Sequence, residues 1–510
     1  MSVVILDFGS QTTQLIARRV REAHVFSEVL PCTVSKAEVL ARSPQAIILS
    51  GGPASVDESS APKFDASILD IDVPVLGICY GHQLLAKVHG GRVERADHRE
   101  FGSAELKIEN PVGILKRFDA GEATEVWMSH GDAVTQLPEG FVVLASSKSS
   151  PNCVVANLTK RHFGIQFHPE VVHSKRGKDV LEAFLFDVAG IAGDWTSASW
   201  VTQSIEDVRK RVPAPEHAIC GLSGGVDSAV AAILCKEALG ERLTCIFVDT
   251  GLLREGERED VTRIFETRVK LVVVDAREEF LSALRGVSDP ETKRKIIGRV
   301  FIDVFDREAA KVSQARFLVQ GTLYPDVIES TSTKGPSAVI KSHHNVGGLP
   351  ENMKLLLVEP LRQLFKDEVR EGGRLLGLPD HLLGRHPFPG PGLAIRCLGE
   401  ITEERLSVLR KADAIFTEEL RASGLYEKIW QAFVALLPVR SVGVMGDQRT
   451  YEETCALRAV TSTDGMTADW YPLPHAFLAK VSNRITNEVR GINRVVYDIS
   501  SKPPATIEWE

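Results

Sequence analysis

The chain has 510 residues, of which 25% are charged and 44% are hydrophobic. This length corresponds to about three domains, and the composition is that of an ordinary globular protein, which excludes a largely disordered or collagen-like chain. Lys and Arg total 60 against 68 for Asp and Glu, which gives a net charge of −8. The sequence contains no concentrated basic run, so we expect neither a nucleic acid nor a membrane as a partner.

The N-terminus and the cysteines suggest a cytoplasmic protein. The first apolar run has no basic flank and ends at Asp7, too early for a signal peptide. No stretch approaches the roughly 20 apolar residues of a membrane span. The eight cysteines include no C-x-x-C pair, so zinc and dithiol motifs are unsupported and reduced thiols are expected.

Short apolar runs alternate with helical patterns from the N-terminus onward, which is typical of parallel α/β folds. In the first part we expect strands at 3–6, 46–49, 73–78 and 163–167. Helices are expected near 11–22, up to Val88, and near 179–188. A glycine-bearing segment at 189–194 marks the first domain boundary.

A second α/β pattern follows the proline-rich residues 212–215. We expect strands at 218–222, 243–248, 271–274, 317–320 and 355–358, and an Ala- and Leu-rich helix at 227–239. The composition of 331–348 suggests a mobile surface loop. The stretch HPFPGPG at 386–392 is too rich in proline for a helix or central strand.

These patterns predict an α/β protein with two doubly wound parallel-sheet domains, followed by a small α+β C-terminal domain. The predicted domains are 1–192, 200–385 and 386–510.

The first candidate site is a cysteine on a tight turn. Gly77-Ile78-Cys79-Tyr80-Gly81 follows a predicted strand and opens a helix, as in the G-x-nucleophile-x-G elbow of hydrolases. The glycines leave room for a strained turn. A helix N-terminus favours the thiolate form of Cys79, and the backbone N–H of Tyr80 can donate to an oxyanion.

A base for this cysteine is offered by the segment FGIQFHPE, residues 163–170. His168 and Glu170 are two positions apart, so at a strand end both side chains point to the same side. Glu170 can then orient His168, which completes a nucleophile, base and orienter set. The turn at 50–53 presents the N–H of Gly52 as a second oxyanion donor.

Together, these motifs resemble the class I glutamine amidotransferases over residues 1 to about 190. The resemblance implies that Cys79 attacks the side-chain amide of glutamine, with His168 as general base and acid. It also implies that glutamine is held by Gln83, Ser129, His130, Gly131 and Asp132.

The second candidate site is the loop Ser223-Gly224-Gly225-Val226-Asp227-Ser228, between a predicted strand and a helix. Small residues and a helix N-terminus suit a phosphate, yet the loop lacks the Walker A pattern. Asp227 would repel a phosphate unless a cation lay between them, which indicates Mg²⁺ on a polyphosphate.

This loop resembles the PP-loop of ATP pyrophosphatases, which release pyrophosphate from ATP and transfer AMP to an acceptor. The resemblance covers about 200–385 and places Gly321 near ATP. Val248 lies at the end of the next predicted strand, where an adenosine would lie in a doubly wound sheet. Lys341 lies at the edge of the predicted mobile loop, from which it could close over the phosphates. Asp326 and Glu329 are candidate groups for Mg²⁺ or pyrophosphate, although two solvated carboxylates fit the pattern equally well. For the pair His343-His344 we favour a metal-free loop, because no carboxylate or Cys lies at ligand spacing.

Three C-terminal stretches bear on the acceptor: HPFPGPGLAIR at 386–396, VGVMGDQRTY at 442–451 and SKPPATIEWE at 501–510. Their Arg, Lys and carboxylate side chains would suit a purine nucleotide, but an interface and a solvated tail are equally compatible.

With these stretches included, the whole chain resembles the glutamine-hydrolysing GMP synthases. That resemblance implies conversion of xanthosine monophosphate (XMP) to GMP with ATP, Mg²⁺ and glutamine, and a homodimer formed by the C-terminal domain. The implied XMP-binding residues are Arg294, Gln431, Asp447, Lys502 and Glu508.

Three alternatives fit parts of the sequence. An NAD or asparagine synthetase shares the PP-loop, but the latter would carry a nucleophilic cysteine where Ser2 stands. A tRNA-modifying PP-loop protein would need a basic surface, which the net charge does not support. An inactive regulatory protein is disfavoured because the motif residues Cys79, His168 and Glu170 are all intact.

Overall fold

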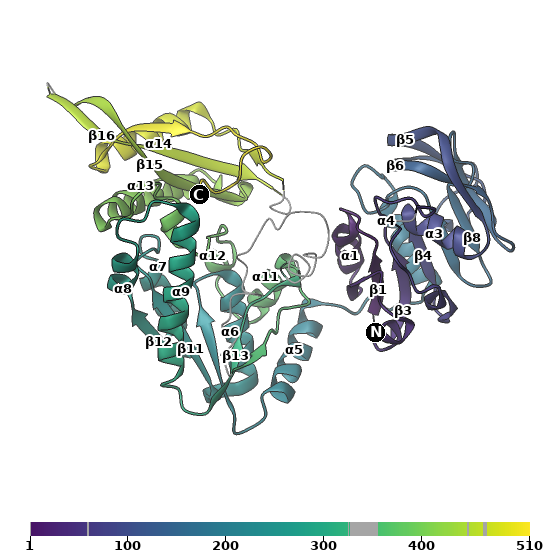
Figure 1. Ribbon diagram of the computed structural model, residues 1–510, viewed down its shortest axis with the longest axis horizontal. Coiled ribbons are helices and arrows are strands. Elements are labelled where there is room, and N and C mark those ends of the chain that lie inside the picture. Colours follow the sequence, from purple (N-terminus) through teal and green to yellow (C-terminus); the bar gives the residue numbers. More distant parts are fainter. Residues whose placement is uncertain (1, 59–60, 325, 327–354, 446–447, 463–466) are drawn as a thin grey trace. The chain divides into compact units, whose positions relative to one another are not determined.

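The computed structural model describes residues 2–58, 61–324, 326, 355–445, 448–462 and 467–510. The chain divides into two compact units, Met1–Trp200 and Val201–Glu510, which can be followed by colour in Figure 1. In the described part of the chain, no helix has both the length and the apolar character needed to cross a membrane.

The first unit is built on one large sheet. Its strands are β1 (Ser2–Asp7), β2 (Ser27–Pro31), β3 (Pro44–Leu49), β4 (Val75–Ile78), β5 (Arg92–Ile108), β6 (Ala123–Gln136), β7 (Val142–Ser147), β8 (Val154–Asn157) and β9 (His162–Ile165). Its helices are α1 (Thr13–Glu22), α2 (Lys36–Leu40), α3 (Tyr80–Val88) and α4 (Gly177–Glu182), the last continued by a π-helical turn (Ala183–Val188).

The strand order is β2-β1-β3-β4-β9-β8-β7-β5-β6. The run from β2 to β9 is parallel, and its strands β3, β4 and β9 are apolar and almost wholly buried, as expected for a sheet covered on both faces. The remaining strands pair in antiparallel fashion. β6 lies at one end of the sheet and also contacts the segment that follows β9. The N–H of His168 in that segment donates to the carbonyl of Trp127 in β6 over 3.0 Å.

The helix α5 (Ser197–Arg211) runs across the division into the second unit, which contains a parallel sheet. Its strands are β10 (His217–Leu222), β11 (Leu243–Asp249), β12 (Lys270–Asp275), β13 (Ala315–Val319) and β14 (Leu356–Val358). Its helices are α6 (Val226–Leu239), α7 (Glu257–Phe265), α8 (Arg277–Ala283), α9 (Pro290–Ala309), α11 (Lys366–Leu375) and α12 (Asp380–Leu383).

The strand order β12-β11-β10-β13-β14 reverses between β10 and β13, and ligands of such sheets bind at the carboxyl ends of the strands at this point. The sheet is covered on both faces. Ile219 packs in one core with Ile297 and Phe305 of α9, whereas the next residue, Cys220, interacts with Cys235 of α6. Successive residues of a strand point to opposite faces, so α9 and α6 cover different sides.

The C-terminal part adds α13 (Glu403–Ala422), α14 (His475–Glu488), β15 (Gln431–Met445), β16 (Gln448–Thr461), β17 (Asp469–Trp470) and β18 (Ile492–Tyr497). β15 and β16 form a long antiparallel hairpin, whose far end reaches beyond the helices in Figure 1. The β10–β11 strands and α13–β15 belong to one continuous apolar core, so this part packs on the second sheet.

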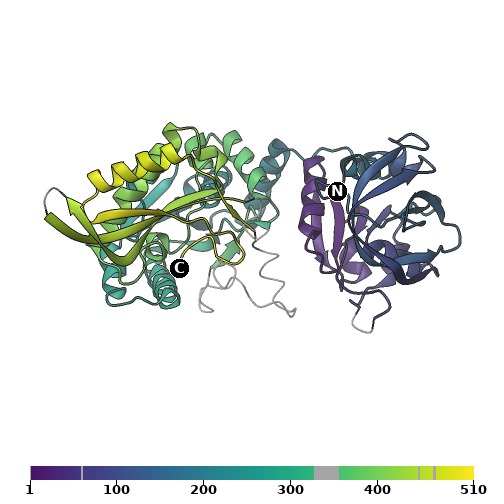
Figure 2. The same ribbon diagram turned by 90° about the horizontal axis from the view of Figure 1, so that it is seen from above.

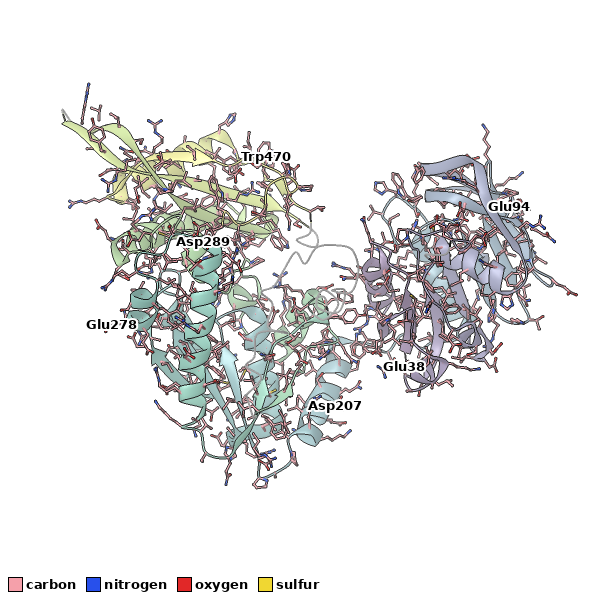
Figure 3. The ribbon with its side chains drawn as sticks, in the orientation of Figure 1. Glu38, Glu94, Asp207, Glu278, Asp289 and Trp470 are labelled. Atoms are coloured by element: carbon pink, nitrogen blue, oxygen red, sulfur yellow. The ribbon has the colours of Figure 1, made fainter. Side chains whose placement is uncertain are left out.

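The C-terminus lies against the start of α9 (Figures 1 and 2). Asp289, labelled in Figure 3, caps that helix by accepting a hydrogen bond from the N–H of Thr292 over 2.8 Å. The first turn of α9 is therefore fixed in place beside the end of the chain.

The predicted fold class is confirmed, and all five strands expected in the second sheet are present. In the first unit, β2 and β5–β8 were not predicted. The expected mobile loop at 331–348 lies outside the described residues. The bounds of the three predicted domains stay predictions.

Candidate active sites

Cys79 lies in a strained backbone conformation directly before α3. Its φ is +52°, a region that residues other than glycine seldom adopt. The turn is fixed on both sides, because the N–H of Cys79 donates to the Ile165 carbonyl over 2.8 Å and the N–H of Gly81 donates to the Ser50 carbonyl over 3.0 Å. Strain of this kind is maintained at functional positions by the surrounding structure.

The elbow glycines are required by close backbone packing. A Cβ on Gly81 would run into the carbonyl of Leu49 at the end of β3, and one on Gly77 would meet the backbone of Gly81. Gly52 is equally confined, since its Cβ would lie 2.7 Å from the Phe8 carbonyl oxygen. The backbone of the elbow therefore packs directly against the sheet, and the backbone of the 50–53 turn packs directly against Phe8.

His168 and Glu170 lie next to the elbow. Nδ1 of His168 is 2.8 Å from Oε1 of Glu170, whose side chain is fully buried. An ideal Cβ on Gly51 would be 3.3 Å from Cε1 of the same imidazole. The predicted base therefore sits between its predicted orienter and the turn that carries Gly52.

Burial by itself lowers the pKa of the His168 imidazole, but hydrogen bonds to Cys79 and Glu170 outweigh it and raise the pKa to about 10. These contacts hold the imidazole between the sulfur of Cys79 and the carboxylate of Glu170.

The strand β6 brings the segment 129–132 to the sulfur. Sγ of Cys79 lies 3.6 Å from the Ser129 carbonyl oxygen, and Nε2 of Gln83 donates to the Asp132 carbonyl over 2.8 Å. His130 is held between the Asp132 carbonyl and Glu100. Of the expected glutamine-binding residues, Ser129 thus contacts the nucleophile, and Asp132, which follows Gly131, contacts Gln83.

Gln166 also contacts the sulfur of Cys79, and the sequence interpretation missed it. It is fully buried, its Nε2 lies 3.7 Å from Sγ of Cys79, and its Oε1 accepts from Nε2 of Gln83 over 3.3 Å. The signal was available, because Gln166 precedes His168 by two positions and shares its side of the chain.

The PP-loop connects β10 to α6. The hydroxyl oxygens of Ser223 and Ser228 lie 3.0 Å apart, and the Ser228 hydroxyl accepts from the N–H of Ser223 over 3.2 Å. Gly224 has a φ of +78°, which favours glycine. The loop thus presents two hydroxyl groups and a helix N-terminus, the elements of an anion site.

Gly321 follows β13 across the point where the strand order reverses. Its Cβ would lie 2.8 Å from the carbonyl carbon of Asp227, so its backbone touches the start of α6. Val248 is buried near the end of β11. These two predicted ATP residues therefore lie near the carboxyl ends of their strands, where the PP-loop also lies.

Asp227 points to a cation. Its Oδ1 is buried and has no hydrogen-bond partner in the described part of the chain. Burial raises the pKa of this carboxyl group, the charge of Lys366 opposes the rise, and the charge of Asp326 adds to it. The described residues contain no group of three or more His, Cys, Asp or Glu side chains arranged for a metal, so any metal here would need oxygens from a ligand or water.

Two cations near the loop were not predicted. Nζ of Lys366, in the first turn of α11, is 3.7 Å from Oδ2 of Asp227, and the charge of Arg370 also acts on that carboxylate. They come from a helix that starts more than a hundred residues later in the sequence, so no local pattern links them to the loop. Lys341 and Glu329 lie outside the described residues.

The C-terminal tail gathers part of the predicted acceptor site. Glu508 accepts from Nε2 of Gln431 over 2.7 Å and from Arg396 over 2.8 and 3.1 Å. Arg294 donates to the main-chain oxygen of Glu510 over 2.5 Å. Lys502 pairs through its backbone with Ala468, and Asp447 lies outside the described residues.

Three family models match the chain. Glutamine amidotransferase class-I matches residues 4–188, NAD synthase matches 198–292, and the GMP synthase C terminal domain matches 418–509. The NAD synthase match covers the PP-loop segment that the alternative interpretation as an NAD synthetase would share. The C-terminal match distinguishes the two.

Curated relatives match over the full length. The chain is 60% identical to a glutamine-hydrolysing GMP synthase of Phenylobacterium zucineum (strain HLK1), covering 100% of this chain and 98% of the relative. It is 59% identical to the one from Rhodopseudomonas palustris (strain ATCC BAA-98 / CGA009), covering 100% and 95%.

Among solved structures, a putative GMP synthase subunit from Thermoplasma acidophilum is 28% identical and covers 37% of this chain and 94% of its own, with a TM-score of 0.34. The full-length matches and the three domain models agree with the motifs in the order in which they occur. The chain belongs to the glutamine-hydrolysing GMP synthase family.

Proposed function

We propose that this enzyme makes GMP in two half-reactions, with glutamine hydrolysed at Cys79 and XMP activated at the PP-loop. The observation that carries the proposal is the strained Cys79 with His168 beside it and Glu170 held 2.8 Å behind that imidazole. Glutamine supplies ammonia, ATP is split to AMP and pyrophosphate, and XMP becomes GMP.

In the first half-reaction, His168 takes the thiol proton of Cys79 and the thiolate attacks the side-chain amide carbon of glutamine. The N–H groups of Tyr80 and Gly52 stabilise the oxyanion. His168 returns the proton to the amide nitrogen, the C–N bond breaks, and ammonia leaves a γ-glutamyl thioester. Water, deprotonated by His168, hydrolyses the thioester to glutamate and restores the thiol.

In the second half-reaction, the oxygen on C2 of XMP attacks the α-phosphorus of ATP and pyrophosphate leaves. Ammonia then attacks C2, the C–O bond breaks, AMP leaves, a proton is released, and GMP forms. The loop 223–228 holds the phosphates through Ser223, Ser228 and the N-terminus of α6. Lys366 lies close enough to the loop to neutralise charge on the departing pyrophosphate.

We propose Mg²⁺ as the metal of this site. The orphaned Oδ1 of Asp227 and the neighbouring charge of Asp326 support the choice, since Mg²⁺ prefers carboxylate and phosphate oxygens. Asp227 would hold the ion through its carboxylate, and the ion would offset negative charge on the phosphate groups.

XMP is proposed to bind beside the C-terminal tail. Arg294 and Lys502 would supply cationic groups for its phosphate, and Gln431, Asp447 and Glu508 would supply polar groups for the rest of the nucleotide. The proximity of Glu508 to Gln431 supports this assignment. We further propose a reducing, cytoplasmic setting, which the eight free thiols support.

A homodimer is proposed through the β15–β16 hairpin. Val442 and Tyr451 are directly opposite each other on the two strands, and both are exposed, as is Val444 at 73%. Clustered exposed apolar side chains of this kind are typical of protein interfaces. Light scattering on the full chain would measure the mass directly, and a monomer would contradict the proposal.

Replacing the nucleophile tests the division between the two sites. Cys79→Ala should abolish GMP formation from glutamine and leave GMP formation from added ammonium intact, with GMP, AMP and pyrophosphate in equal amounts. Cys32→Ala, at another buried cysteine of the same unit, is the matched control. Loss of both activities in Cys79→Ala would contradict the assignment.

A further inference from the structure

The segment Arg385–Arg396 contacts both the PP-loop and the proposed acceptor site, yet nothing in the reaction scheme uses it. We propose that it is a strut that sets the position of the PP-loop relative to the XMP site, with Arg385 as the positioning residue at its ATP end. The inference rests on the proposed function, because it assumes that ATP and XMP bind at these two places.

The ATP end of the strut holds the PP-loop backbone. Nη1 of Arg385 donates to the Gly224 carbonyl over 3.3 Å, and Nη2 donates to Oδ2 of Asp260 over 3.3 Å. The same guanidinium lies 3.6 Å from the buried carboxylate of Glu257. Two acidic groups of α7 thus orient Arg385 so that it fixes the peptide between Gly224 and Gly225, in the part of the loop that wraps the phosphate.

The other end of the strut contacts the acceptor side. The guanidinium of Arg396 is fully buried and makes two hydrogen bonds to Glu508. Closer to the Arg385 end, the Pro387 carbonyl also accepts a hydrogen bond from Nε2 of Gln431 over 3.1 Å. The strut therefore touches both Glu508 and Gln431 of the proposed XMP site.

The residue that follows Arg385 is held rigidly. The ring of His386 stacks on Tyr426 with centroids 3.8 Å apart. Its Nδ1 accepts from the N–H of Ala432 and its Nε2 is 2.8 Å from the Tyr426 carbonyl. Burial lowers the pKa of His386 to about 4, so the ring is neutral and both of its nitrogens have partners.

Further along, the strut is tied to the loop that follows β11. The N–H of Leu393 donates to the Leu252 carbonyl over 2.8 Å. A Cβ on Gly392, whose φ is +63°, would run into the same carbonyl. The prolines within 387–391 stiffen the backbone between these contacts, so the strut is held along its length and not only at its two ends.

Phe388 and Arg254 link the strut to α7 and α13. The ring of Phe388 lies 4.9 Å from the guanidinium of Arg254 and 5.1 Å from that of Arg396. Arg254 pairs with Asp413 over 3.2 Å, and its backbone N–H donates to Glu257. A displacement of the strut would therefore disturb charged groups packed around both ends.

The reaction requires ATP and XMP to be held in a precise relative position. The XMP oxygen must lie in line with the α-phosphorus, and small misplacements of reacting atoms cost large factors in rate. The PP-loop follows β10, whereas Glu508 and Gln431 belong to the C-terminal part. A rigid connection between the PP-loop and the C-terminal part keeps ATP and XMP in a fixed relative position.

The test measures binding to the full-length enzyme, with an ATP analogue that is unreactive at its α,β-bridge and with XMP, each alone and together. Arg385→Met should weaken binding of the ATP analogue by about tenfold or more, the size expected for a lost charged hydrogen bond. Binding of XMP alone should change by less than about twofold. Any mutual enhancement between the two ligands in the wild type should shrink, since coupling of this kind is reciprocal.

Conservative variants separate positioning from general damage. Arg385→Lys should recover part of the affinity for the ATP analogue. Asp260→Asn, which leaves Arg385 in place and loosens one of its contacts, should produce a smaller loss in the same direction. Arg374→Met, at an exposed arginine of α11 paired with Asp380, is the matched control and should change neither affinity.

Two results would overturn the inference. One is an Arg385→Met enzyme that binds the ATP analogue as tightly as the wild type. The other is an equal loss of ATP-analogue and XMP binding with a lower melting temperature, which would indicate a structural role only. A wild-type enzyme that fails to bind XMP would instead contradict the proposed function.

Discussion

Glu170 controls the proton on His168 from a fully buried position. Its hydrogen bond and charge are among the interactions that raise the pKa of His168 to about 10 in spite of burial. Glu170→Gln should therefore lower the pKa of His168 and move the alkaline limb of the glutaminase pH–rate profile to lower pH. The profile of glutamine hydrolysis measures this directly.

The same shift affects stability. The pKa of His168 is raised on folding, so its contribution to stability is complete below the ordinary value of about 6.5 and is lost as the pH rises through about 10. The wild type should lose more stability than Glu170→Gln between these limits. Glu139→Gln, at an exposed carboxylate of the same unit, is the control for the pH–rate profile and should leave its alkaline limb unmoved. An identical shift in Glu139→Gln would contradict the role assigned to Glu170.

Residues near the reacting groups were predictable where a motif of neighbouring residues in the sequence specified them. The elbow, the His-x-Glu spacing and the S-G-G-x-D-S loop each combine residue type with a strand end, so Cys79, His168 and Asp227 could be proposed as site residues from the sequence. Lys366 and Arg385 could not, because they reach the PP-loop from distant segments. Only the packing of α11 and of the strut places those cations beside the loop.

At the scale of elements, the elbow depends on how closely α3 approaches β3. The amide of Gly81 donates to Ser50, and a Cβ there would collide with the Leu49 carbonyl. Gly81→Ala should destabilise the first unit by about 1–3 kcal/mol, the usual range for overpacking, and should reduce glutaminase activity sharply. Denaturant unfolding and the two nitrogen-source assays measure these effects.

The matched control for Gly81→Ala is Gly298→Ala in α9, where a Cβ would meet no atom within 4 Å. Alanine is the better helix former there, so stability should stay equal or rise slightly. Retained ammonia-dependent synthesis in Gly81→Ala would localise the damage to the first unit. Full glutaminase activity in that variant would show that the close approach is not required.

The sequence pattern predicted the buried parallel strands better than the antiparallel ones. Strands such as β11 are buried along their whole length and are apolar almost throughout, which makes them easy to recognise. By contrast, β5 contains several charged residues over its 17 positions. It was missed because its pairing with β6, and not its own hydrophobicity, specifies it as a strand.

At the scale of the molecule, the proline-rich stretch at 386–392 illustrates the limit of composition. A run of proline and glycine excludes regular structure, but it does not distinguish a linker from a rigid connection. Here Leu393, Ala394 and Cys397 belong to the same core as Ile219 of β10 and Val434 of β15. The second unit therefore has a continuous core across the place where the sequence suggested a boundary.

The end of the chain is held by a buried lysine. Lys293 is fully buried, and its Nζ donates to the carbonyls of Ala394 and Cys397 over 3.2 and 2.9 Å and to the carboxylate of Glu510 over 2.5 Å. Glu510 also accepts from the N–H of Gly399. Because Glu508 is only two residues away, this anchor positions the carboxylate that we assign to XMP.

Lys293→Met should therefore release the tail and weaken XMP binding. Removing one partner of a buried pair commonly costs about 3–5 kcal/mol, of which part should appear as a rise in KM for XMP of about tenfold or more, with KM for ATP changed by less than about twofold. Lys295→Met, two positions along the same helix at a lysine that is 74% exposed, should alter neither value. Equal rises in both KM values would point to a misfolded second unit, and an unchanged KM for XMP would mean that Glu508 is positioned without the Glu510 anchor.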